Sequence, residues 1–134
     1  MFKITIKPLK TNDWKIVTNY EELYFYEIPM LFTGFNKKNQ RIMASSVYED
    51  FENKIERFFY IIISEPLFEK FLQQKITLLQ ILQNNQPFFV VDEAFDRSKS
   101  TVYNVNHNDI PPKYLPLEDS YYPYKQEVKK KNAA

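Results

Sequence analysis

The sequence predicts a single α+β domain whose mostly antiparallel β-sheet, of five to seven strands, is packed by two consecutive helices at about residues 64–84. A chain of 134 residues has the size of one domain. Runs of alternating or continuous apolar residues recur along both halves of the chain, as in β-strands. Two short amphipathic segments that begin with helix-capping residues lie between them. The prediction places the domain at residues 1–124.

The chain begins with a predicted strand at residues 2–7, where Phe2, Ile4 and Ile6 alternate with polar side chains. Pro8 ends this strand, because proline cannot donate a hydrogen bond to a neighbouring strand. A second short extended segment is expected at about residues 14–20.

A β-hairpin is predicted next. Residues 30–36 form its first strand, residues 37–40 form a solvated turn of lysines and asparagine, and residues 41–47 form its second strand. Gly34 lies inside the first strand, where glycine often marks a bulge or a close approach of backbones. The acidic residues 49–53 are expected to form an exposed connection.

Three further strands are predicted after this connection. Residues 55–63 give the strongest signal, and their second half is apolar on both faces, as in a central strand that is covered on each side. Residues 88–91 form another buried strand, and residues 101–105 form the last one.

Two helices are predicted between these strands. Ser64 can cap the first helix, and its apolar face comprises Leu67, Phe68, Phe71 and Leu72. Thr77 and Gln80 have the spacing of a capping box at the start of the second helix. Asn84-Asn85 is expected to end that helix in a left-handed conformation.

Residues 110–124 are expected to form an extended arm, because they hold four of the eight prolines and four of the ten tyrosines. The arm could pack on an edge of the body or be offered to a partner, and its apolar content favours packing. Residues 125–134 form a basic tail that is expected to be disordered. The tail holds four lysines and one glutamate, which leaves 14 basic and 16 acidic residues elsewhere. This slight excess of acidic residues outside the tail is not typical of a dedicated DNA-binding domain.

A series of short motifs follows in order along the chain: Ile28-Pro29-Met30-Leu31-Phe32, a hairpin, an acidic loop, an aliphatic strand with Ser64-Glu65, Lys75-Ile76-Thr77-Leu78-Leu79-Gln80-Ile81-Leu82, and Asp109-Ile110-Pro111-Pro112-Lys113-Tyr114-Leu115-Pro116. In this order they resemble an uncharacterised bacterial family of small α+β domains (DUF 6575-like). The resemblance covers about residues 14–122 and implies an α+β fold. It implies no catalytic residue, cofactor or ligand.

The composition excludes several catalytic chemistries. The chain has one glycine, one histidine and no cysteine. Phosphate-binding and dinucleotide-binding loops need at least two glycines, and a zinc-binding H-E-x-x-H helix needs two histidines. Thiolate nucleophiles and cysteine zinc clusters need cysteine. The sequence therefore predicts a protein that is not an enzyme and has no cofactor.

Two groups of residues could still carry chemistry. His107, with Asp109 close by, could act as a general base, but we interpret it as a solvated residue of a polar loop. Four acidic residues could offer oxygen ligands to Mg²⁺ or Ca²⁺, but their spacing fits no calcium loop and we interpret them as a solvated loop: Glu49, Asp50, Glu52 and Glu56. No catalytic or metal-binding residue is therefore predicted.

The leading functional hypothesis is a cytoplasmic, non-enzymatic protein–protein interaction module. It could be an accessory subunit, immunity protein or inhibitor of a bacterial or phage-encoded system, in phage defence or counter-defence. Tyrosine is enriched at protein interfaces, although these tyrosines could equally cover the edges of the core. The candidate partner-binding residues are Tyr20, Tyr24, Tyr26, Tyr114, Tyr121 and Tyr122.

The alternative function is a nucleic-acid-binding accessory protein. In that case exposed aromatic side chains stack on bases, and Lys129, Lys130 and Lys131 contact phosphates. No apolar run approaches the ~20 residues that span a bilayer, so a membrane is not an expected partner.

Overall fold

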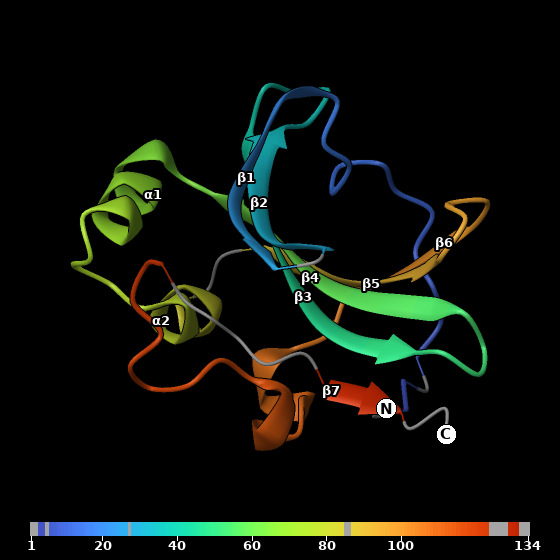
Figure 1. The fold of residues 1–134 in the computed structure, drawn as a ribbon. Coiled ribbons are helices and arrows are strands. Elements are labelled where there is room, and N and C mark those ends of the chain that lie inside the picture. Colours follow the sequence, from blue (N-terminus) through green and yellow to red (C-terminus); the bar gives the residue numbers. More distant parts are fainter. Residues whose placement is uncertain (1–2, 5, 27, 85–86, 124–128, 132–134) are drawn as a thin grey trace.

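The chain folds into one sheet with two short α-helices on one side, which confirms the predicted single α+β domain (Figure 1). The computed structural model describes residues 3–4, 6–26, 28–84, 87–123 and 129–131, and only the backbone of residues 25–26, 28–29 and 129–131. Six strands pair antiparallel in chain order: β1 (Thr18–Tyr26), β2 (Ile28–Phe35), β3 (Arg41–Asp50), β4 (Ile55–Ile63), β5 (Phe88–Ala94) and β6 (Ser100–Tyr103). A seventh strand, β7 (Lys129–Lys131), pairs parallel with β3.

β4 is a central strand with the bounds predicted for residues 55–63. β3 and β5 pair with it on its two sides. Phe59 and Ile61 are buried in one hydrophobic cluster, and Phe58 and Tyr60 are buried in another. Both faces of the strand exclude water, which explains why its second half is a continuous apolar run.

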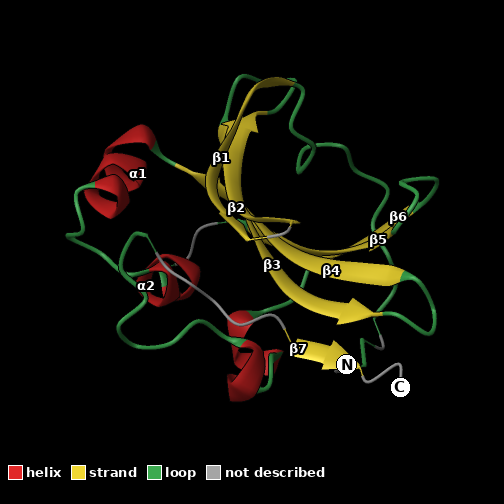
Figure 2. Ribbon diagram, in the orientation of Figure 1, coloured by secondary structure: helices red, strands yellow, loops and turns green. Residues whose placement is uncertain are grey.

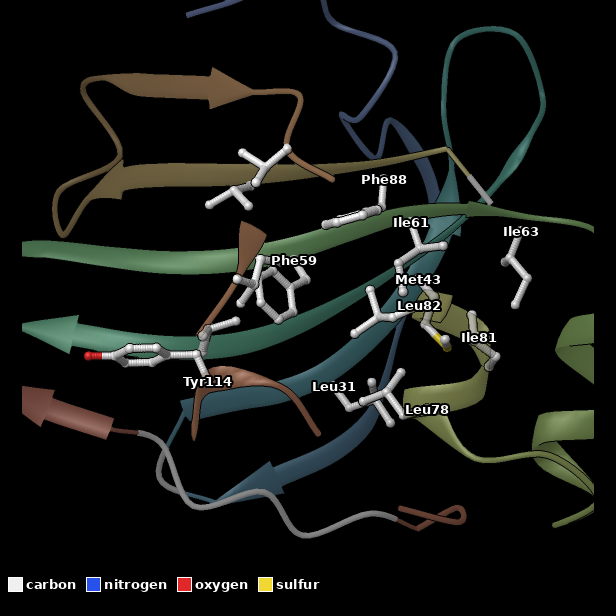
Figure 3. Packing of buried hydrophobic residues seen from close by; sticks show 14 of the residues in the cluster. Leu31, Met43, Phe59, Ile61, Ile63, Leu78, Ile81, Leu82, Phe88 and Tyr114 are labelled. Carbon is white, nitrogen blue, oxygen red and sulfur yellow. The ribbon is translucent and has the colours of Figure 1, made fainter. Parts of the chain in front are cut away.

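The larger cluster lies between the sheet and the helices α1 (Glu65–Leu72) and α2 (Leu78–Gln83) (Figures 1 and 2). Leu78, Ile81 and Leu82 of α2 lie against side chains of the sheet such as Met43 and Ile61 (Figure 3). Neither helix, nor any other helix among the described residues, is long and apolar enough to cross a membrane.

The smaller cluster lies on the opposite face of the sheet, where the N-terminal segment before β1 runs. Trp14 of that segment is 5% exposed, and Ile16 packs against the same cluster. The buried members from the sheet are Phe32, Ile42, Ala44, Phe58, Tyr60, Val91 and Val102. The sheet is thus covered on both faces.

The predicted helix starts are confirmed. The Ser64 hydroxyl accepts a hydrogen bond from the backbone N–H of Leu67. Thr77 Oγ1 accepts from the Gln80 backbone N–H at 3.0 Å, and Gln80 Oε1 accepts from the Thr77 backbone N–H at 2.9 Å, which completes the capping box. Asn84 ends α2 with φ −98°, so the predicted left-handed stop is wrong at this residue, and Asn85 lies outside the described residues.

The described part of the predicted arm, residues 110–123, packs on the helix-bearing face. It is turned rather than extended, since it follows the 3₁₀ turn η1 (His107–Asp109) and contains η2 (Pro112–Tyr114). Ile110 and Tyr114 belong to the larger cluster, so the arm covers that face of the sheet instead of wrapping an edge. Its apolar side chains favour this buried position over the edge that we expected.

Ser120 fastens the arm to the start of α2. The Ser120 carbonyl oxygen accepts from the Leu78 N–H at 2.9 Å, and its hydroxyl accepts from the Leu79 N–H at 3.1 Å. These are N–H groups that have no partner within their own helix. A single residue, 41 positions after Leu79 in the chain, thus satisfies both of them.

Most strand bounds differ from the prediction. The extended segment expected at about residues 14–20 begins as β1 only at Thr18 and continues to Tyr26, and three further differences follow. Residues 3–4 and 6–7 do not form the predicted first strand; the N-terminal segment joins β6 through one bridge, between Leu9 and Val102. Glu49 and Asp50 complete β3 instead of opening a loop, because a bulge between Ser46 and Tyr48 prolongs the pairing with β4. Within the expected disordered tail, residues 129–131 form β7, and the rest lies outside the described residues.

Gly34 makes the close approach that was predicted for it. A Cβ atom at this position would lie 2.3 Å from Ile16 Cγ2 and 2.9 Å from the Thr18 carbonyl oxygen. β1 has a register shift opposite Gly34, between Thr18 and Glu21. The absence of a side chain lets the N-terminal segment lie directly on β2.

Candidate functional site

A hollow of about 480 Å³ lies between the N-terminal segment and the sheet, on the face away from the helices. Its volume is within the range of roughly 300–1,000 Å³ that is common for ligand sites. We call it the aromatic hollow. Residues 14–20 contribute to its lining, and the other lining side chains are Phe32, Glu56, Phe58, Tyr60, Glu93 and Arg97.

The alternation of β4 places a carboxyl group and two rings on the same face of the sheet. Glu56, Phe58 and Tyr60 are spaced by two residues, so their side chains point to one side. Trp14 joins them from the N-terminal segment, where its indole N–H donates to the Thr11 carbonyl oxygen at 2.8 Å. That bond fixes the Trp14 ring in the wall of the hollow.

The aromatic rings of the hollow pack mainly edge to face. The Tyr60 ring centroid lies 5.1 Å from that of Trp14, 5.9 Å from that of Phe32 and 5.9 Å from that of Phe58. The Tyr20 ring extends this group toward solvent, 5.5 Å from Phe32 and 52% exposed. Such contacts stabilise the group beyond the burial of its area, so the wall of the hollow is rigid.

Carboxyl groups from three neighbouring strands meet beside these rings. Glu56 of β4 is the direct cross-strand partner of Glu49 on β3 and of Glu93 on β5. Glu49 and Glu56 are each only 8% exposed. Directly opposed residues have Cβ atoms within about 5.5 Å of each other, so three acidic side chains lie in one row.

Hydroxyl groups and one guanidinium group offset this negative charge. The Ser46 hydroxyl donates to Glu56 Oε2 at 3.2 Å, and the Ser100 hydroxyl donates to Glu93 Oε2 at 3.1 Å. Arg97 forms an ion pair with Glu93 through Nη1 and Oε1. Glu56 Oε1 receives no hydrogen bond from the described residues.

Burial changes the acidity of the groups around the hollow. Burial raises the pKa of Glu56 to about 7; the Ser46 hydrogen bond and the charge of Arg97 oppose this rise, and the carboxylates of Glu49 and Glu93 add to it. Burial also raises the pKa of Tyr60 well above the ordinary value of tyrosine, and it raises the pKa of Tyr20 to about 12. Both phenols are therefore neutral at physiological pH.

This arrangement can bind a positively charged group and can exchange a proton near neutral pH. Aromatic faces and carboxylates both attract cations. Within the described part of the chain, no set of three or more acidic or histidine side chains has the geometry of a metal site. The rings and carboxyl groups that line the aromatic hollow suit an organic cation or a hydrogen-bonding ligand.

The structure separates the six tyrosines of the interaction hypothesis. Tyr20 lies at the aromatic hollow, and Tyr121 is 46% exposed on the arm. Tyr24 and Tyr122 are half-buried against the larger cluster, while Tyr114 is 6% exposed within it. The side chain of Tyr26 lies outside the described residues.

The other candidate residues lie away from one another. His107 borders a separate hollow of about 240 Å³, and no carboxylate is among the described residues that line it. The interpretation of a solvated acidic loop is wrong for Glu49, Asp50 and Glu56, which are buried in strands. Glu52 is exposed in the β3–β4 turn. The side chains of Lys129, Lys130 and Lys131 lie outside the described residues.

Sequence reasoning misses the aromatic hollow because its residues come from four separate parts of the chain. One local signal points to it. Glu56, Phe58 and Tyr60 alternate along the strand, so the Glu56 carboxyl group lies on the same face of the sheet as the two aromatic rings. The contributions of Trp14 and Arg97 depend on tertiary contacts that no local pattern encodes.

Comparison with known protein families, curated proteins and solved structures found no match for this chain. The resemblance of residues 14–122 to the uncharacterised bacterial family therefore stays a prediction.

Proposed function

We propose that this chain is a non-enzymatic protein–protein interaction module that receives part of a partner protein in the aromatic hollow. The observation that carries the proposal is the exposed ring of Tyr20 beside a rigid aromatic wall with two carboxyl groups. Rings of this kind, which supply large contact areas at small cost in conformational entropy, dominate many protein interfaces. A cytoplasmic accessory subunit, immunity protein or inhibitor of a bacterial or phage-encoded system would act in this way.

The acidic side chains of the hollow favour a protein over a nucleic acid. The carboxyl groups of Glu56 and Glu93 offset the two basic residues of the lining, so the hollow lacks the excess of positive charge that supplies most of the affinity in nucleic-acid binding. Lys15 and Arg97 also line the hollow, but Arg97 is already paired with Glu93. Bases could stack on Tyr20, yet their phosphates would find no excess of positive charge in the described lining.

Purification of the tagged protein from its native host tests the proposal. The double variant Val17→Asp/Tyr20→Ser changes two exposed residues at the hollow, where Val17 is 56% exposed. A matched control, Leu117→Asp/Tyr121→Ser, makes the same changes on the exposed arm, where Leu117 is 64% exposed. We expect one protein to co-purify in stoichiometric amount with the wild type and the control, and to be lost from the hollow variant.

Three outcomes would contradict the proposal. The protein could emerge from its host without a partner, or the arm variant alone could lose the partner. Recovery of nuclease-sensitive material in place of a protein would instead support the nucleic-acid alternative. Circular dichroism of each variant separates loss of binding from loss of folding.

A further inference from the structure

The aromatic hollow already holds a cation of the chain itself. Arg97 lies in the turn between β5 and β6, and its Cζ is 5.8 Å from the Phe58 ring centroid while its Nη1 pairs with Glu93. This distance is within the range of cation–π contacts. The structure thus shows that a guanidinium group fits between a ring and a carboxylate of this hollow.

Arg97 is held weakly enough to be replaced. Its side chain is 55% exposed, and exposed ion pairs contribute little to stability because solvent screens them. Arg97 pairs with Oε1 of Glu93, whereas the Ser100 hydroxyl donates to Oε2. The hydrogen bond from Ser100 would therefore still hold the Glu93 side chain after Arg97 has left. Displacement of Arg97 therefore leaves the wall of the hollow in place.

The hollow also offers an acceptor that Arg97 does not use. Glu56, 8% exposed, receives the Ser46 hydroxyl on Oε2, and Oε1 receives no hydrogen bond from the described residues. Glu56 and Glu93 are direct cross-strand neighbours. A planar group with several N–H donors can reach both carboxyl groups, whereas the compact ammonium group of lysine suits a single acceptor.

We propose that the aromatic hollow binds the guanidinium group of an arginine side chain presented by a partner protein, which replaces Arg97 against Glu93 and Phe58 and adds a contact to Glu56. This inference rests on the proposed function, because it assigns the chemistry of the partner residue. The lining holds two carboxyl groups, Glu56 and Glu93, against two basic residues, Lys15 and Arg97, so an incoming guanidinium group gains a net attraction only by taking the place of Arg97.

Titration calorimetry with three blocked tripeptides tests the proposal: acetyl-Gly-Arg-Gly-amide, its lysine counterpart and its citrulline counterpart, which is neutral and nearly the same shape as arginine. We expect saturable binding of the arginine peptide, with citrulline about tenfold weaker or more because the charge-assisted hydrogen bonds are lost. The lysine peptide should also bind more weakly. Quenching or enhancement of Trp14 fluorescence on titration places the peptide in the hollow.

Variants distinguish replacement of Arg97 from a general charge effect. Arg97→Gln removes the internal competitor and should strengthen binding of the arginine peptide about fivefold, the size expected for loss of an exposed ion pair. Glu93→Gln should abolish the binding. Lys113→Gln is the matched control, because Lys113 is an exposed cation 5.2 Å from the Tyr114 ring, away from the hollow, and it should leave the affinity unchanged.

The proposal would be overturned by lack of saturation with both the wild type and Arg97→Gln, or by equal affinities for the arginine and citrulline peptides. Equal affinities for arginine and lysine would also reject it, since the hollow would then sense charge alone. Tighter binding of free L-arginine than of the blocked peptide would reject a protein as the source. If these tests fail while the Val17 and Tyr20 changes still remove a co-purifying partner, the proposed function stands with a different contact residue.

Discussion

Glu56 carries a carboxyl group that is largely removed from solvent, and no described residue of opposite charge forms an ion pair with it. Ser46 donates to it, Arg97 is close enough to lower its pKa, and Glu49 and Glu93 act in the opposite direction. Burial dominates and raises the pKa from 4.5 to about 7. The folded state therefore holds a proton on Glu56 at pH values where the unfolded chain has released it.

The stability of the protein should accordingly depend on pH through Glu56. Because the folded-state pKa lies above the unfolded value, the free energy of unfolding is highest below pH 4.5 as far as this group is concerned, and it falls as the pH rises to about 7. Glu56→Gln keeps an acceptor for Ser46 and removes the charge. We expect it to raise the free energy of unfolding at pH 8 by about 2 kcal/mol and to flatten this part of the pH profile.

Urea unfolding at pH 5 and pH 8 measures this effect. Glu118→Gln, a change of the same kind at an exposed position, should leave the pH profile as it is in the wild type. If Glu56→Gln keeps the wild-type difference between the two pH values, Glu56 is not the group responsible.

At the residue scale, the sequence predicted features that depend on neighbouring residues in the chain, and it missed side-chain environments that depend on tertiary contacts. The close approach at Gly34 followed from a lone glycine inside a strand pattern. The buried environment of Glu56 could not be predicted, because a run of acidic residues is usually solvated. The bulge after Ser46 extends the β3–β4 pairing and so places Glu49 directly opposite Glu56. The ring of Trp14 reaches the hollow across more than 40 residues of chain.

At the element scale, α2 depends on a distant residue as well as on its own sequence. A helix of six residues is too short to be stable alone. Its N-terminus has the internal capping box of Thr77 and Gln80, and its first two N–H groups also donate hydrogen bonds to Ser120. The arm thus acts as a second cap for α2.

Ser120→Ala tests that second cap. The change removes the hydroxyl that accepts from the Leu79 N–H and leaves this part-buried N–H without that partner. We expect a loss of about 1 kcal/mol in the free energy of unfolding, the size of an ordinary N-cap deletion. Urea unfolding followed by circular dichroism measures it, and Ser98→Ala, at an exposed turn residue, is the control. A loss no larger than that of the control would show that the arm does not support α2.

Local signals explain which elements could be predicted. β4 and both helix starts were predicted at their observed bounds because apolar runs and capping residues act within a few positions. Polar and apolar side chains alternate along residues 2–7 as they do in a strand, so the pattern predicts one there. Among the described residues, the start of the chain pairs with the sheet at the Leu9–Val102 bridge instead. The turns of the arm, around Pro112, depend on the surface that the arm covers.

At the scale of the whole molecule, one sheet separates two hydrophobic clusters, and β4 and β5 contribute to both. Val90 and Val91 are adjacent, fully buried, and belong to opposite clusters. Because the same strands serve both clusters, neither can come apart while the other stays folded, and unfolding should be a single cooperative step.

Val90→Ala and Val91→Ala test this coupling as a matched pair. Each should lower the free energy of unfolding by about 2 kcal/mol through lost burial and a residual cavity. Trp14 fluorescence reports on the smaller cluster, and circular dichroism reports on the sheet and helices. Both signals should shift together in urea for both variants. Separate transitions, with Val91→Ala moving the fluorescence signal alone, would show that the two faces unfold independently.

The irregular pairing of β1 has a consequence for the protein in concentrated solution. β1 lies at one end of the strand order, and its ladder with β2 is interrupted by three register shifts, with Asn19 at φ 52°. Glu21 and Glu22 are exposed along it. A straight, uncharged edge strand can pair with a strand of another molecule, whereas an irregular edge strand with acidic side chains resists such intermolecular pairing. The same bend that seats the N-terminal segment on Gly34 thus protects the sheet against aggregation.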